Sequence, residues 1–345
     1  MKAKKTNKNI ESFSVIVFLS VFLAIFPVIA DAGTALPKSV AIATMPKGSM
    51  SSILGGGLAK IITTYTPMTA VDRPYTGYQI WVPLTDKGSV DMSIGSINEY
   101  SWAYRGLENY KERLKNLRVL CGGNSLVNCY VANPATGIKT IKDFKGKRIA
   151  FDPTSKSISK RPLALMRAAG LDPEKDLTLI PIAGVPAGLA ELGEGRVDAS
   201  WCAIGTAVAK ELYAKFGGLT WVSLVSSYDD PGAKWIRENS PGEDVVFIKA
   251  GIVPEVKNDY WGLDANNFLV TNIGMGDEAI YLITKAIWEH QKELVAIYPA
   301  FGTWHENMVT DRGWVPYHPG AVRFYKEVGV WSDKMEKLQQ KRLAE

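Results

Sequence analysis

The sequence has few of the residues on which metal and disulfide chemistry depend: three cysteines and three histidines in 345 residues. It contains no His-Glu-x-x-His and no Cys-x-x-Cys, which leaves little ligand supply for a first-row metal, whereas a hard cation held by oxygens stays open. Three cysteines allow at most one intramolecular disulfide. The chain also lacks Gly-x-x-x-x-Gly-Lys-Ser/Thr and Gly-x-Ser-x-Gly, which argues against a nucleotide P-loop and a hydrolase nucleophile elbow.

A large charge excess is also absent, because 40 basic residues face 35 acidic ones, too small a difference to indicate binding to nucleic acid. Four of the lysines precede an apolar run over 13–26, which is followed by Pro27 and Ala30-Asp31-Ala32. This order is typical of a secretory signal peptide cleaved after Ala32. The alternative is an uncleaved anchor, but the run is shorter than the ~20 residues that span a bilayer. We expect residues 1–32 to be removed and the remainder to be exported to the periplasm.

Strand-like and helix-like segments alternate along the chain. The expected strands are 40–44, 91–94, 118–121, 148–151, 177–182 and 199–203. The expected helices are 50–65, 80–87, a short one from Ile141 to the stop at Gly146, 162–169, and one long helix over 277–297. Between 228 and 263 no period is clear, and we expect this segment to wrap the surface. The alternation indicates parallel sheets covered by helices, the α/β class.

In open parallel sheets, ligands bind beyond the carboxyl ends of the strands, where helix N-termini present free N–H groups. The strand-to-helix turns are therefore the candidate site, and we include 122–125 among them. The candidate ligand-binding residues in these turns are Lys47, Gly48, Ser49, Ser51, Arg73, Tyr75, Tyr78, Ser96, Asn98, Thr154, Ser155, Ser157 and Trp201. No catalytic residue and no metal ligand is predicted.

Each candidate has a structural alternative. Gly48 allows close approach of the backbone to a ligand and the serines after it offer hydroxyls, but Ser is also a favoured helix cap. Arg73 suits a bidentate clamp on a carboxylate, or it is a solvated surface charge. Tyr75, Tyr78 and Trp201 form pocket walls or belong to the core. Together the turns predict a small anion, such as a carboxylate, as the ligand.

Three segments resemble those of periplasmic solute-binding proteins. Residues 137–149, Gly-Ile-Lys-Thr-Ile-Lys-Asp-Phe-Lys-Gly-Lys-Arg-Ile, are similar to a block common among such receptors, as are 193–199, Gly-Glu-Gly-Arg-Val-Asp-Ala. More specifically, 315–331, Val-Pro-Tyr-His-Pro-Gly-Ala-Val-Arg-Phe-Tyr-Lys-Glu-Val-Gly-Val-Trp, resemble the C-terminal signature of the TAXI family. Members of that family are the solute receptors of one branch of tripartite ATP-independent periplasmic (TRAP) transporters. The resemblance extends over roughly residues 38–331.

The resemblance implies an α/β, two-lobed periplasmic-binding-protein (type II) fold with a ligand cleft between the lobes. Lobe I would hold residues 33–130 and 270–345, and lobe II residues 131–269. It also implies no catalysis and no cofactor, a small organic acid or an amino acid such as glutamate as ligand, and integral membrane TRAP permease subunits as partners. One departure is the turn over 153–157, which lacks the glycines of many members and so limits the comparison there to Thr154, Ser155 and Ser157.

Two other functions stay open. One is a periplasmic sensor that docks on a signalling partner, and the other is a secreted hydrolase or acyltransferase. For the latter, Ser157-Ile158-Ser159-Lys160 matches Ser-x-x-Lys, but the Ser-Asp-Asn and Lys-Thr-Gly elements that complete such a site are absent. A disulfide between Cys121 and Cys129 is possible if the chain turns back between them, and Cys202, in an apolar stretch, is expected to be buried and free.

The Arg73 clamp is testable. Arg73→Lys keeps the charge but removes the planar fork, so we expect at least a ~tenfold loss of affinity for the carboxylate ligand, equivalent to ~1.4 kcal/mol. Arg73→Ala should lose more. Calorimetric titration measures both, and an Arg73→Ala variant that binds as tightly as the parent would make Arg73 a surface charge only.

Overall fold

The structure is a computed structural model that describes residues 1, 36–153 and 156–345. The predicted signal peptide and its cleavage position after Ala32 therefore lie outside the described residues, apart from Met1. Within the described ranges no helix is both long and apolar enough to cross a membrane.

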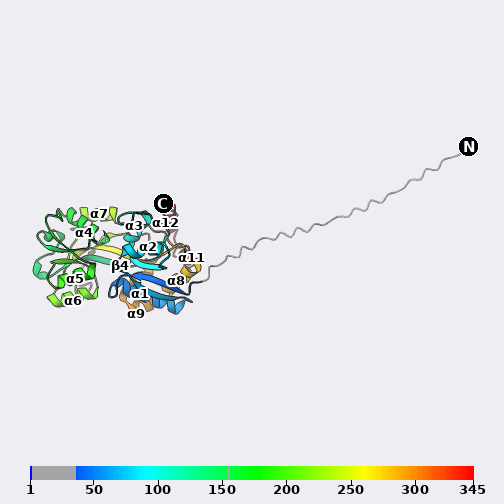
Figure 1. The fold of residues 1–345 in the computed structure, drawn as a ribbon, viewed down its shortest axis with the longest axis horizontal. Coiled ribbons are helices and arrows are strands. Elements are labelled where there is room, and N and C mark those ends of the chain that lie inside the picture. Colours follow the sequence, from blue (N-terminus) through cyan, green and yellow to red (C-terminus); the bar gives the residue numbers. More distant parts are fainter. Residues whose placement is uncertain (2–35, 154–155) are drawn as a thin grey trace. The chain divides into compact units, whose positions relative to one another are not determined.

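The strands of the described residues form one ten-stranded sheet with the order β2-β1-β3-β10-β4-β7-β5-β6, in which β8 also pairs with β4 and β9 with β10 (Figure 1). Their bounds are β1 Ser39–Thr44, β2 Thr69–Pro74, β3 Met92–Ser96, β4 Leu117–Ala132, β5 Arg148–Phe151, β6 Thr178–Pro181, β7 Ala199–Ala203, β8 Thr220–Val222, β9 Asp244–Ile248 and β10 Tyr260–Asn272. β1 is parallel to β2 and β3, and β5 to β6 and β7. β10 is antiparallel to β3 and β4, and β4 is antiparallel to β7. The predicted parallel strands thus form two groups, β2-β1-β3 and β7-β5-β6, within one sheet, and the antiparallel strands β10 and β4 lie between them.

Helices cover both groups of strands, with α4–α7 around one group and α1–α3, α8, α9, α11 and α12 around the other (Figure 1). Their bounds are α1 Met50–Tyr65, α2 Tyr78–Asp86, α3 Ile97–Arg105, α4 Lys156–Ala168, α5 Val185–Gly193, α6 Ala207–Phe216, α7 Pro231–Asn239, α8 Asp277–Glu289, α9 Gln291–Ile297, α10 Trp304–Asn307, α11 Pro319–Glu327 and α12 Asp333–Ala344. Short 3₁₀ turns occupy Pro134–Thr136, Ile141–Phe144 and Pro299–Thr303. The elements predicted around β1, α1, β5 and β7 are confirmed nearly residue for residue.

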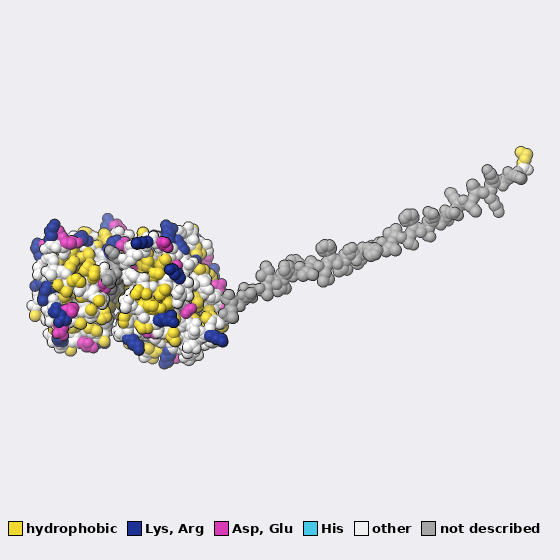
Figure 2. Space-filling model, viewed as in Figure 1, with side chains coloured by type: hydrophobic (Ala, Val, Ile, Leu, Met, Phe, Trp, Pro, Cys, Tyr) yellow, Lys and Arg dark blue, Asp and Glu magenta, His cyan; other side chains and the backbone are white. Residues whose placement is uncertain are grey.

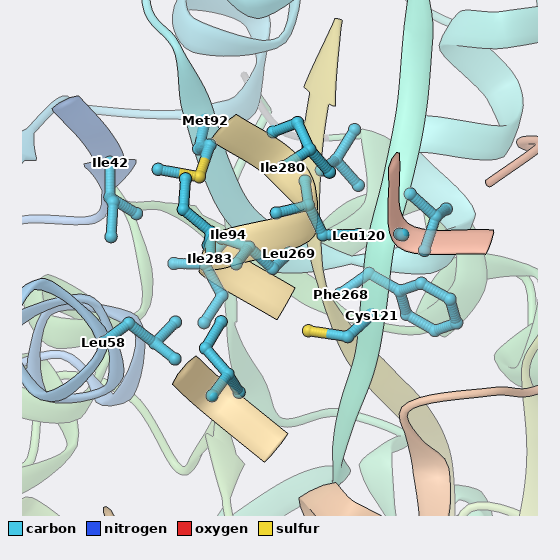
Figure 3. Close-up of a cluster of buried hydrophobic side chains, with 14 of the residues drawn as sticks. Ile42, Leu58, Met92, Ile94, Leu120, Cys121, Phe268, Leu269, Ile280 and Ile283 are labelled. Atoms are coloured by element: carbon cyan, nitrogen blue, oxygen red, sulfur yellow. The ribbon is translucent and has the colours of Figure 1, made fainter. Parts of the chain in front are cut away.

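The buried hydrophobic side chains fall into two clusters. The first cluster comes from residues 40–121 and 268–335, and the second from residues 127–263. Figure 3 shows part of the first, where side chains of β1, β3, β4 and β10 gather with Leu58 of α1 and Ile283 of α8. The helical spacing of the apolar residues in α1 buries Leu58 completely against the strands.

The chain passes between the two clusters along β4 and β10. In β4 the change falls between Cys121 and Val127, and in β10 it falls between Leu263 and Phe268. The two strands pair with each other over most of their length, with register shifts around Asn266/Phe268 and Leu269/Val270. Two long paired strands therefore connect both halves of the sheet.

This arrangement overturns two predictions. Residues 122–125 are not a turn, because they continue β4 without interruption. Cys121 and Cys129 lie eight residues apart on that strand, about 26 Å at ~3.3 Å per residue, so they cannot form a disulfide. All three cysteines are buried and have free thiols. Cys202 of β7 lies opposite Cys129 of β4 in the strand register.

Two further predictions were wrong in detail. The segment 228–263 does not simply wrap the surface, since it contains α7 and β9 as well as the start of β10. The overlooked signal is Asp230 before Pro231, where Asp230 caps α7 by accepting a hydrogen bond from the Gly232 N–H at 2.8 Å. The predicted helix over 277–297 is divided into α8 and α9 at His290, which leaves helical geometry and stacks on Tyr65 with ring centroids 3.3 Å apart.

The signature segment 315–331 has a structural explanation. His318 caps α11, with its buried Nδ1 accepting a hydrogen bond from the Gly320 N–H at 3.2 Å, and burial lowers the pKa of His318 to about 4. Gly320 lies against α8 so closely that a Cβ would be 2.2 Å from the Asp277 carbonyl oxygen. The motif therefore joins α11 to α8 in the first cluster.

Gly122 provides a test of the connecting strands. A Cβ at this position would lie 2.3 Å from the Asn307 carbonyl oxygen, so Gly122→Ala forces the backbone apart and should destabilise the protein by about 1–3 kcal/mol. Gly56 is the control, because it is exposed in α1 with no atom near its Cβ position. Gly56→Ala should stabilise by about 0.5–1 kcal/mol. Urea unfolding measures both, and equal stabilities would contradict the close packing at Gly122.

Candidate functional site

The candidate site begins where β3 ends and α3 starts. The Ser96 hydroxyl is buried, and Asn98 is completely buried with neither its amide nitrogen nor its oxygen bonded to any described residue. Ser96 precedes α3 without capping it through its side chain, so the free N–H groups of this helix end are close by. Each unpartnered buried polar group costs about 1–3 kcal/mol, which a ligand or ordered water would relieve.

Tyr78 of α2 closes over the same strand end. Its hydroxyl accepts a hydrogen bond from the Ser96 backbone N–H at 3.2 Å, and burial raises the pKa of Tyr78 to about 12. The ring fits because Gly95 has no side chain; a Cβ there would lie 2.3 Å from the ring. Tyr78, Ser96 and Asn98, all predicted from the sequence, are thus brought together.

Arg161 of α4 supplies the cation of this site. It forms a buried ion pair with Glu243, whose carboxylate also accepts a hydrogen bond from the Ser240 hydroxyl. Burial raises the pKa of Glu243, and the Arg161 guanidinium counteracts that rise. Gly242, the neighbour of Glu243, packs against Ile97 at the start of α3, since a Cβ at Gly242 would lie 2.7 Å from the Ile97 side chain; this contact brings the ion pair near the end of β3.

A second buried carboxylate, Glu99, lies in the first turn of α3. It accepts a hydrogen bond from the Tyr110 hydroxyl at 3.1 Å, and its charge raises the pKa values of Tyr78 and Glu243. We define the strand-end site by the residues that share this region. They are Tyr78, Ser96, Asn98, Glu99, Arg161 and Glu243. The residues of this site come from both sides of the connecting strands. On the face seen in Figure 2, a furrow runs between the two halves of the folded part.

Asparagines of the connecting strands extend this polar region. Asn267 pairs in register with Ser96, and its side-chain amide donates to Asn124 at 3.2 Å. Asn124 also accepts from the Trp304 indole at 3.3 Å and lies 3.5 Å from the Met50 sulfur at the start of α1. The first turn of α1 is therefore close to the same strands.

The other predicted residues of the β1–α1 turn are placed as follows. Lys47 and Gly48 are exposed, and Gly48 has a φ of +89°. The Ser49 hydroxyl caps α1 by accepting from the Ser52 N–H at 3.2 Å, and the Ser51 hydroxyl accepts from the Met45 N–H at 3.1 Å. Both hydroxyls thus serve the turn itself.

Of the remaining predicted residues, Arg73 is exposed at the end of the edge strand β2, and Tyr75 is half-buried beside it. Trp201 is buried in the second cluster, where its ring packs edge-on against Tyr130 with centroids 5.1 Å apart. Ser157 lies in the first turn of α4. The predictions for Thr154 and Ser155 lie outside the described residues.

Sequence reasoning missed Arg161, Glu99 and Glu243. Arg161 precedes Pro162, and because proline favours a first helical turn the helix was expected to begin at Pro162. In the structure Pro162 lies inside α4, which puts Arg161 on the helix and against Glu243. Glu99 had a weak signal in Ser96-x-x-Glu99, the spacing of a capping box.

In the part of the chain that the structure describes, no group of three or more His, Cys, Asp or Glu side chains is placed to hold an ion.

The buried ion pair predicts a large cost for losing its acid. Glu243→Gln removes the negative charge beside the buried Arg161 and should destabilise the protein by about 3 kcal/mol, the lower end for a broken buried pair because Gln retains hydrogen bonds. Glu174→Gln is the control, because Glu174 pairs at 2.6 Å with Arg167 of the same helix but in solvent, and it should cost less than about 1 kcal/mol. Chemical denaturation measures both, and equally small losses would show that Arg161 does not depend on Glu243.

Comparison with solved structures identifies the fold. The chain is 14% identical to MatC from Rhodopseudomonas palustris with bound malate, with a TM-score of 0.54 over 90% of this chain and 99% of that one. PhnD1 from Prochlorococcus marinus in complex with methylphosphonate is 12% identical, with a TM-score of 0.52 over 85% and 99%. A structure described as a periplasmic transporter is 11% identical, with a TM-score of 0.50 over 89% and 97%. The predicted α/β fold of two-lobed periplasmic binding proteins is confirmed.

A comparison of the sequence with models of protein families also finds a match. The model of the NMT1-like family matches residues 42–329, which is most of the chain. This match does not distinguish the TAXI subtype, which therefore stays a prediction. On its fold and on the extent of this match, the chain belongs to the NMT1-like family.

Proposed function

We propose that this protein is a periplasmic solute-binding receptor of the TAXI type, which captures a small organic anion between two lobes and delivers it to the membrane subunits of a TRAP transporter. The two hydrophobic clusters are the cores of the lobes, and β4 and β10 connect them. The observation that carries the proposal is the strand-end site, where Arg161 and the unpartnered Ser96 and Asn98 side chains are buried together.

The chemistry of this site suits a carboxylate. Arg161 provides a planar set of donors, Asn98 an amide donor and Ser96 a hydroxyl, next to the positive end of α3. Hydrogen bonds to charged groups contribute roughly 1.5–3 kcal/mol each, so three or four supply much of the ~8 kcal/mol that micromolar affinity requires. The buried carboxylates Glu99 and Glu243 favour a ligand that also carries a donor, as an amino acid or a hydroxy acid does.

The exposed turn residues have a secondary role in this proposal. Lys47, Gly48, Arg73 and Tyr75 stand at the carboxyl ends of β1 and β2, on the same edge of the sheet as Ser96. They remain predicted contacts for a ligand that extends beyond the buried site, whereas Arg161 holds its carboxylate.

A thermal-shift screen of organic acids and amino acids would identify the ligand, and calorimetry of variants would then test the site. Arg161→Lys should weaken binding at least about tenfold, because Lys lacks the planar fork. Arg167→Lys is the matched control: it lies in the same helix with its side chain about half exposed, and it should bind as the parent does.

Two outcomes would contradict this function. A screen that returns only cations or neutral sugars would exclude the anion, and undiminished affinity of Arg161→Lys would exclude the proposed site. Hydrolysis of generic ester substrates by the purified protein would instead favour an enzyme.

A further inference from the structure

A second polar site lies outside the strand-end site. A cavity of about 330 Å³, open to solvent on one side, is lined by α12, the segment 311–314, the end of α3 and the segment that leads from α7 to β9. Five basic side chains line it, against the two acids Asp311 and Glu345. The basic residues are Arg105, Arg237, Arg312, Lys341 and Arg342.

Three of the arginines already have carboxylate partners. Arg105 pairs with Glu345, Arg237 with Asp244 at 3.3 Å, and Arg312 with Asp264 at 3.0 Å. These partners explain why the arginines are held around the cavity.

Arg342 has a different environment. Its Nη2 donates to three backbone carbonyls, those of Asp311 at 2.7 Å, Arg312 at 3.1 Å and Gly313 at 2.8 Å. The residue is only 3% exposed, and its Nε and Nη1 are buried with no partner among the described residues. Burial lowers the pKa of Arg342, which is the direction expected for a cation whose charge is not fully compensated.

We propose that this cavity is a binding site for a small oxyanion, such as inorganic phosphate or a polycarboxylate, held by Arg342 together with Arg237 and Lys341. A buried cation without a carboxylate partner favours an external anion, and the unpaired donors of Arg342 offer it hydrogen bonds as well as charge. The volume is at the lower end of the range for small-molecule sites.

The oxyanion site is separate from the strand-end site. The two sites share no residue, although Gly242 of the cavity lining precedes Glu243: a Cβ at Gly242 would lie 2.7 Å from the Ile97 side chain and 3.1 Å from the Gly313 nitrogen. The residues that line the cavity come from both halves of the structure. Arg237 follows residues of the second hydrophobic cluster in the chain, and Arg312 follows residues of the first. An anion in the cavity therefore stabilises the contact between these segments.

Inorganic phosphate and citrate are the probes, tested on the full mature chain by thermal shift and calorimetry against sodium chloride at equal ionic strength. We expect a saturable rise in Tm with at least one of them, and at least a tenfold weaker affinity for Arg342→Gln. Lys337→Gln is the matched control, because Lys337 is exposed on the same helix and does not line the cavity. Since Arg342 also supports three carbonyls, Arg237→Gln is the second variant and should weaken binding as well.

The outcomes separate this site from the proposed receptor function. Arg161→Lys should retain the response to phosphate or citrate. A response that disappears with Arg161→Lys but survives Arg342→Gln and Arg237→Gln would place the anion in the strand-end site and overturn this inference. An unsaturable response, or one equal in all variants, would show an adventitious ion only and overturn it as well. Failure of the organic-acid screen alone would leave the oxyanion result unchanged.

Discussion

The antiparallel pairing of β4 with β10 is the interaction on which the rest of the structure depends. Each strand contributes hydrophobic residues to the first cluster at one end and to the second cluster at the other, so each core is completed by chain that also belongs to its neighbour. The pairing also carries Asn124 and Asn267 to the level at which β3 ends. Without it, the parallel strands on either side would have no common sheet, and the polar groups of the strand-end site would not meet.

Burial of charge is the second constraint. Arg161 and Glu243 are both almost completely buried and Glu99 is fully so, whereas many other basic and acidic side chains lie on the face seen in Figure 2. Removing such groups from water is costly and is compensated only by close partners and hydrogen bonds. The same low-dielectric surroundings would strengthen the contacts of the proposed site with a charged ligand.

The segments that carry the family resemblance serve mainly the fold. Asp143 in the first of them caps a 3₁₀ turn, accepting hydrogen bonds from the N–H groups of Lys139 and Thr140 at 3.0 and 2.8 Å. His318 and Gly320 in the last one fasten α11 to α8. Motifs of this kind identify the scaffold, while the residues of the proposed strand-end site lie elsewhere in the chain.

The sequence by itself determined the α/β class, because apolar periodicity and helix signals are local: β1, α1, β5 and β7 follow directly from them. It also predicted Ser96 and Asn98 as candidate ligand-binding residues, because ligands of open parallel sheets bind beyond the carboxyl ends of the strands. Only the tertiary structure decided that 122–125 continue a strand. Adjacent glycines in a sequence indicate a turn, and only the pairing with a neighbouring strand shows that these two belong to β4. It likewise decided that Arg161 is buried, because the partner that neutralises this cation, Glu243, is 82 residues away along the chain.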